Sequence, residues 1–151
     1  MNEMTVAGAA LAPLLDAFHT VQGQILMGAR AIHLEGCLST VILDFDRHSL
    51  MIRANPEDDT VRFSAVGGPD TRRNEGLTVS DVPPWKDFIG QPFGWGWITV
   101  NQQGYCDGVL LSFAGITPQV KLSVVASSIK EGAITDLPSA PEIREIGDRN
   151  A

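Results

Sequence analysis

The chain has 151 residues, a formal net charge of −7 and only 19% charged residues. This length suits one domain with its own core, and the acidic balance argues against a general nucleic-acid binder and against binding to anionic membranes. No apolar run approaches the ~20 residues that a membrane-spanning helix needs. Because Glu3 stands where a signal peptide carries lysine or arginine, we expect an uncleaved, cytoplasmic protein.

The first element in the chain is predicted to be a helix. Apolar residues between Ala7 and Phe18 recur at the i, i+3, i+4 spacing of one helical face. Pro13 is compatible with a helix only in the first turn, because further along it would remove a hydrogen bond and clash with the preceding turn. The sequence therefore predicts a helix over residues 10–20.

Beyond this helix the apolar period shortens to about two, which indicates strands. Four such segments follow one another with short polar turns between them, as in an antiparallel meander. They cover residues 25–34, 37–45, 49–54 and 60–66. Residues 67–84 are rich in glycine, proline and charge, and are predicted to be a linker.

The second half of the sequence predicts one helical turn over residues 85–90 and three more strands. These strands are expected near residues 94–100, 105–113 and 120–127, with glycine-containing turns between them. The predicted fold is therefore α+β: an N-terminal helix packed on a mainly antiparallel meander sheet of about seven strands, arranged as a sandwich or a half-barrel. We expect a single domain over residues 1–136 and a flexible tail over residues 137–151.

The Gly-Trp-Gly-Trp segment has two interpretations. Strand alternation places Trp95 and Trp97 on one face and Gly94 and Gly96 on the other. In the first interpretation the glycines let a helix or an aromatic ring pack closely, and the tryptophans lie in the core, one ring covering Gly108. In the second, the glycine face and the indoles line a ligand or partner groove. The sequence leaves both open.

Two turns are candidate contact sites for a partner. The first is polar and uncharged, and it either reads hydrogen bonds on a partner or is only a hairpin loop; it contains Asn101, Gln102, Gln103 and Tyr105. The second is acidic, and it either steers a basic protein partner or only keeps the chain soluble. Its carboxylates are those of Glu57, Asp58 and Asp59.

No motif in the sequence indicates a catalytic site. Asp44, Asp46 and His48 could in principle bind one cation, but a solvated strand end explains them more simply, and the histidines show no metal-site spacing. Cys37 and Cys106 are expected to be buried thiols and not a disulfide. Because Asp107 beside Cys106 opposes thiolate formation, a nucleophilic thiol is disfavoured. We predict no metal and no cofactor.

One long pattern resembles a known family. It reads WK-x-x-IG-x-x-FGWGW-x-TVNQQGY-x-DGVLLSF-x-x-I-x-P over residues 85–118, and VASSI follows at residues 125–129. The pattern is similar to that of a family of small bacterial proteins containing a domain of unknown function, with a weaker match over residues 49–59. The resemblance implies a relationship and assigns no catalytic residues.

These observations predict a non-enzymatic binding protein. An immunity-type inhibitor or an adaptor, which binds its partner protein by surface complementarity, fits the profile best. A small-ligand binding or sensor domain that uses the face of Trp95 and Trp97 is an alternative. An enzyme with a dispersed site is a further one. The sequence makes no prediction of the oligomeric state.

Overall fold

The computed structural model describes residues 5–6, 9–67 and 76–134, so the predicted tail lies outside the described residues. Its helix, α1 (Leu11–Val21), confirms the predicted one to within a residue at each end. A pair of two-residue strands, β1 (Thr5–Val6) and β2 (Ala9–Ala10), precedes it. No helix in the described ranges is long and apolar enough to cross a membrane.

The remaining strands form two antiparallel sheets. The first has the order β6-β5-β4-β3-β7 and the second the order β11-β10-β9-β8. The first contains β3 (Leu26–Leu34), β4 (Cys37–Phe45), β5 (His48–Asn55), β6 (Thr60–Gly67) and β7 (Leu77–Thr78). The second contains β8 (Phe93–Val100), β9 (Cys106–Phe113), β10 (Val120–Val125) and β11 (Ser128–Ala133).

The α+β class is confirmed, but the strand count of about seven is wrong, because these two sheets together hold nine strands. β7 was missed because it is only two residues long, inside the predicted linker. β11 was missed because its turn carries no glycine or asparagine: Ala126 and Ser127 adopt positive φ values of 52° and 67°. Such values normally favour Gly, Asn or Asp. Because none of these residues stands in the turn, the strand before it was predicted to continue to residue 127.

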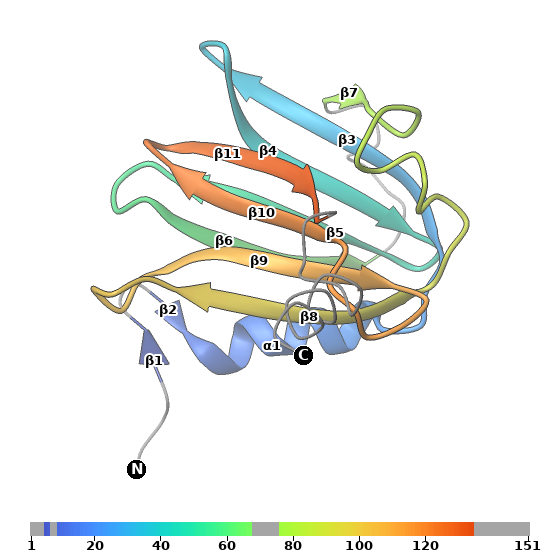
Figure 1. Cartoon of the computed structure of the whole chain (residues 1–151), viewed down its shortest axis with the longest axis horizontal. Helices are drawn as coiled ribbons and strands as arrows, with labels where there is room; N and C mark the ends of the chain where they lie inside the picture. The colour runs from blue at the N-terminus through green and yellow to red at the C-terminus, as the bar shows by residue number, and fades with distance from the viewer. Residues whose placement is uncertain (1–4, 7–8, 68–75, 135–151) are drawn as a thin grey trace, which may run out of the picture.

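The two sheets are stacked as the layers of a sandwich, with the four-stranded sheet in front in Figure 1. One core cluster draws side chains from both layers, including Leu43 and Ile52 of the first sheet and Leu111 and Leu122 of the second. α1 contacts β5, β6 and β8. Phe18 of the helix stacks on Phe63 of β6, with the ring centroids 4.8 Å apart, so the helix closes one open side of the sandwich.

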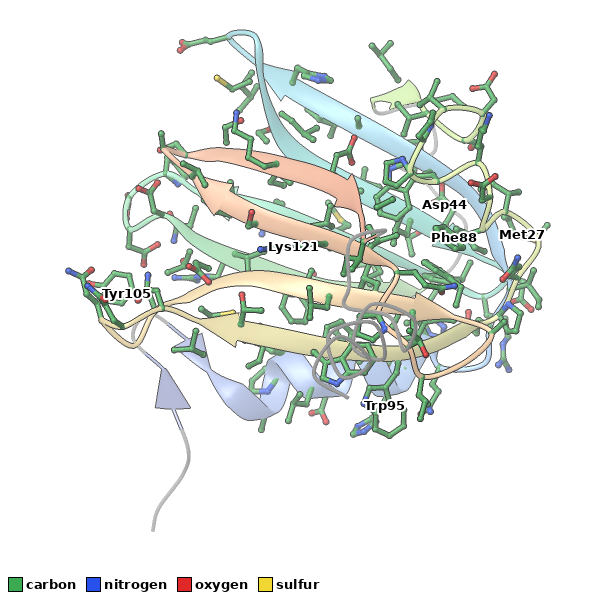
Figure 2. The ribbon with its side chains drawn as sticks, viewed as in Figure 1. Met27, Asp44, Phe88, Trp95, Tyr105 and Lys121 are labelled. Carbon is green, nitrogen blue, oxygen red and sulfur yellow. The ribbon has the colours of Figure 1, made fainter. Side chains whose placement is uncertain are left out.

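The segment between β7 and β8 supplies further core residues. The predicted helical turn at residues 85–90 is a series of hydrogen-bonded turns instead of a helix. Trp85 in this segment is 0% exposed, and its indole Nε1 donates to the Glu131 carboxylate of β11 at 3.2 Å. Phe88 stacks on Phe113 of β9, with the ring centroids 4.9 Å apart. Figure 2 labels Phe88 near the end of β9.

Gln24 fixes the C-terminal end of α1 to the turn between β4 and β5. Its Oε1 accepts from the backbone N–H groups of Arg47 and His48, and its Nε2 donates to the Thr20 carbonyl oxygen. Because Nε2 is a donor, the His48 Nδ1 that lies 2.9 Å from it accepts. The helix is thereby held in one position relative to the sheets, and this position defines one wall of the groove between α1 and β8.

Glu131 makes the stability of the fold depend on pH. Burial raises the pKa of its carboxyl group, and the Trp85 hydrogen bond and the charge of His33 lower it in part. A raised pKa means that the folded state holds this proton more tightly than the unfolded state does. The resulting stabilisation is complete below the unfolded-state pKa and is lost as pH rises through the folded-state pKa.

We therefore expect Glu131→Gln to remove this pH dependence. Glutamine stays neutral, and its Oε1 can still accept from the indole of Trp85. Urea unfolding from about pH 5 to about pH 8, the range above the ordinary carboxyl pKa, is the measurement. The variant should be as stable as the wild-type protein at neutral pH or more so, and a pH slope equal to that of the wild-type protein would contradict the assignment.

Candidate functional site

A groove runs between α1 and the edge strand β8. Its volume is about 210 Å³, and its walls include Leu15 and His19 of the helix, Gln22 directly after it, and Gly94, Trp95 and Gly96 of the strand. Leu15 and His19 are four positions apart and so share one face of α1. Leu15 is 37% exposed and Trp95 47% exposed. We call this feature the Trp95 groove; Figure 2 shows Trp95 next to α1.

Two glycines of β8 allow close approaches, Gly96 to the helix and Gly94 to the turn after β9. A Cβ at Gly96 would lie 2.6 Å from ring atoms of Phe18, and one at Gly94 would collide with the carbonyl oxygen of Gly115. The register shifts between Phe93 and Trp95, which interrupts the regular alternation at Gly94. The predicted close approach of a helical aromatic ring to the glycine face is therefore correct for Gly96.

Of the two interpretations, the one that places both tryptophans in the core does not hold. Trp95 is exposed and Trp97 only partly buried, on the outer face of the sheet, while the fully buried indole is that of Trp85. Gly108 does not lie under a ring either, since a Cβ there would meet the Leu122 carbonyl oxygen and the Thr99 hydroxyl at 2.8 Å. Alternation identifies which residues share a face, but not which face is covered.

The groove is apolar with a polar rim. Phe18 and Phe93 form its floor, and both are buried. The Gln22 amide donates to the Gly94 carbonyl oxygen at 3.5 Å, which places one polar group at the junction of helix and strand. This arrangement can receive an apolar side chain and offer one or two hydrogen bonds at its rim.

The polar turn of residues 101–105 lies at the other end of β8 from Trp95 (Figure 2). Asn101 shapes this turn, because its Oδ1 accepts from the N–H groups of Gln103 at 2.9 Å and Tyr105 at 3.2 Å. Gln102 and Gln103 are exposed, whereas Tyr105 is partly buried. The structure therefore does not unite this turn with the Trp95 groove, and its role as a contact site stays a prediction.

Two carboxylates of the acidic turn have structural roles. Asp58 accepts from the backbone N–H and the hydroxyl of Thr60, at 3.2 and 2.6 Å. Asp59 accepts from the backbone N–H of Ser127 at 2.8 Å, and so ties the β5–β6 turn to the β10–β11 turn of the other sheet. Glu57 is exposed. Steering of a basic partner by this turn stays a prediction.

The three residues considered for a cation do not converge. Asp44 accepts from Arg30 through both carboxylate oxygens at 2.8 Å and from Ser49 at 2.7 Å. Asp46 accepts from the backbone N–H of Ile25, and the Nδ1 of His48 faces Gln24. Among the described residues, no group of three or more His, Cys, Asp or Glu side chains could hold a metal ion.

The cysteines differ in their surroundings. Cys106 is buried as predicted, whereas Cys37 is exposed, which corrects the prediction that both are buried. The pKa of the Cys106 thiol is raised to about 11, mainly by burial; a hydrogen bond with the backbone of Gly108 lowers it in part, and the charge of Asp107 adds to the rise. Burial, and not the neighbouring carboxylate, is thus the larger cause of the raised pKa.

We expect the two thiols to react in sequence with a water-soluble disulfide reagent. At about pH 8, near the ordinary thiol pKa, Cys37 should be modified readily in the folded protein. Cys106 should react only when denaturant is added, because its thiolate is scarce and buried. Absorbance of the released thiolate, with Cys37→Ser as the control, measures this. If Cys106 reacts rapidly in the folded Cys37→Ser variant, the description of Cys106 as a buried thiol is contradicted.

Comparison with known proteins gives one relationship. A family model described as "Family of unknown function (DUF6334)" matches residues 11–137. No curated protein and no solved structure matches the chain. The resemblance to a domain of unknown function is thereby confirmed, and the match takes in α1, both sheets and the Trp95 groove.

Proposed function

Since the chain belongs to the DUF6334 family, a family of unknown function, we propose its function from its own geometry. It is a non-enzymatic binding protein, and the Trp95 groove is its recognition element for a partner protein. The observation that carries this proposal is that Trp95, at 47% exposure, stands on the wall of an apolar groove. Exposed aromatic side chains beside a pocket are typical anchors of protein–protein interfaces.

The size of the groove favours a protein partner over a small ligand. Pockets for drug-sized ligands generally enclose about 300–1,000 Å³, whereas this groove has about 210 Å³. That space suits one apolar side chain of a partner, with the indole of Trp95 covering it from one side. Leu15, which is 37% exposed on the opposite wall, would become buried in the same event.

The chemistry of the candidate reactive groups supports binding over catalysis. The pKa of the Cys106 thiol is raised to about 11 by burial, so at neutral pH this thiol is protonated and a poor nucleophile. Asp44 is engaged by Arg30 and Ser49. An immunity-type inhibitor or adaptor, which acts by covering part of its partner, needs no reactive group. A toxin reading frame next to this gene would support the inhibitor version of the proposal.

We expect Trp95→Ala to weaken capture of the partner strongly while leaving the fold intact. Truncation of an interface anchor typically costs about 2 kcal/mol or more of binding free energy, roughly a thirtyfold loss of affinity. The indole is half exposed, so the loss of folding stability should be smaller than for a core aromatic. The measurement is a pull-down from the native host, followed by titration calorimetry with the captured protein.

Leu34→Ala is the matched control for this experiment. Leu34 is 62% exposed at the end of β3, and Figure 1 shows this end of β3 at the top of the molecule and α1 at the bottom. The control should capture the same protein as the wild-type chain. The proposal fails if folded Trp95→Ala retains the partner with unchanged affinity, or if the control loses it equally.

A further inference from the structure

A second hollow lies on the outer face of the four-stranded sheet. It has a volume of about 450 Å³, and Lys121, Ser123, Lys130 and Gly132 line it from the adjacent strands β10 and β11. We call it the lysine cleft. It holds two of the three lysines of the chain, and both are exposed, with no salt bridge to any described carboxylate. Figure 2 shows Lys121 on the sheet that faces the viewer.

The strand register brings these residues together. Lys121 pairs with Gly132 and Ser123 with Lys130, without a register shift between β10 and β11. Since alternate residues of a strand share a face, all of these residues belong to the outer face. The carboxylate of Glu131, which also lines the cleft, accepts from Trp85 and is directed between the sheets. The polar groups that remain to meet an incoming molecule are two ammonium groups and a hydroxyl.

Neither packing nor backbone conformation accounts for Gly132. A Cβ at this position would meet nothing within 4 Å, and the residue is not among those with positive φ. A glycine inside a regular strand weakens the strand and often marks a place where a ligand or another backbone approaches. Here it opens the sheet surface between the lysines.

We propose that the lysine cleft binds an acidic segment of a partner protein, whose carboxylates meet Lys121 and Lys130 while its backbone passes over Gly132. An extended segment that lies on this face meets both strands, because Lys121 belongs to β10 and Lys130 to β11. The proposal is independent of the Trp95 groove, from which the cleft is separated by β9.

Electrostatics gives the proposal a definite sign. The whole chain carries −7 and repels an acidic segment at long range, so attraction has to come from the lysines at short range. Salt screens both contributions. If the affinity for the acidic segment falls as salt is added, the local attraction by the lysines dominates. If that affinity rises, only the repulsion by the net negative charge is present.

The test uses the full-length protein and a short synthetic peptide in which glutamate and serine alternate. A peptide with glutamine in place of glutamate is the control ligand. In two-dimensional NMR titrations we expect the acidic peptide to shift the amide signals of Lys121, Ser123, Lys130 and Gly132, with affinity falling as salt rises. The uncharged peptide should shift none of them. No shift with the acidic peptide, or affinity that rises with salt, overturns the proposal.

Three variants separate recognition from folding. We expect Lys121→Gln combined with Lys130→Gln to weaken binding of the acidic peptide about tenfold, as two exposed ion pairs imply. Lys86→Gln, at the exposed third lysine, should leave this binding unchanged.

Gly132→Val should fold with stability equal to or above that of the wild-type protein, because its side chain enters open space, and yet it should no longer bind the peptide. Unchanged binding by folded Gly132→Val, or an equal loss in Lys86→Gln, overturns the assignment. So does a wild-type dimer that the double lysine variant abolishes, because a second copy would then occupy the cleft.

Discussion

Trp85→Ala is expected to lower the free energy of unfolding by about 3–5 kcal/mol, the range for truncation of large buried aromatic residues. Trp85 is 0% exposed, and it is among the largest fully buried side chains of the described chain. Its removal would leave a cavity between the sheets. It would also take from the partly buried Glu131 carboxylate the indole donor that lies 3.2 Å away. Urea denaturation followed by circular dichroism measures the effect.

Two controls make this result specific. Trp85→Phe keeps most of the packing and removes only the donor, so we expect a loss of about 1–3 kcal/mol, the usual cost of an unsatisfied buried polar group. Trp97→Ala removes an indole of the same size from the partly exposed outer face. It should cost clearly less than Trp85→Ala. Equal losses for Trp85→Ala and Trp97→Ala would contradict the description of Trp85 as the core indole.

Gly96→Ala is expected to destabilise the protein by about 1–3 kcal/mol, as overpacking of a tight site does. The new methyl group would lie 2.6 Å from the ring of Phe18, which is itself stacked between Phe63 and Phe93 and cannot move freely. Either the ring or the helix must shift. Because this contact positions α1 against β8, the variant should also alter the Trp95 groove.

A double-mutant cycle with Phe18→Leu tests the cause. The smaller side chain makes room for the added methyl group, so the cost of Gly96→Ala should be markedly lower in the Phe18→Leu background. Gly132→Ala is the matched strand glycine, because nothing lies within 4 Å of its Cβ position. It should leave stability unchanged or slightly raised. Strict additivity in the cycle would show that Phe18 is not the residue that limits the space at Gly96.

The elements with strong local signals were predictable from the sequence alone. The helix and the strands of the meander appear within a few residues of their expected bounds, because apolar periodicity reports local conformation directly. Family membership was also readable, since it depends on residue identity in order. β11 was not predictable, because its positive-φ turn at Ala126 and Ser127 carries no glycine or asparagine.

Only the tertiary structure decided the properties of the candidate sites. Periodicity places Trp95 and Trp97 on one face, but whether that face is covered depends on where α1 lies, and α1 is positioned through Phe18 and Gln24. The role of Asp59 was equally hidden, since its hydrogen-bond partner Ser127 is 68 positions away in the sequence. Sequence patterns determine conformation and faces because these depend on near neighbours. Exposure, hollows and carboxylate partners depend on residues far away in the chain, and so they emerge only when the layers are assembled.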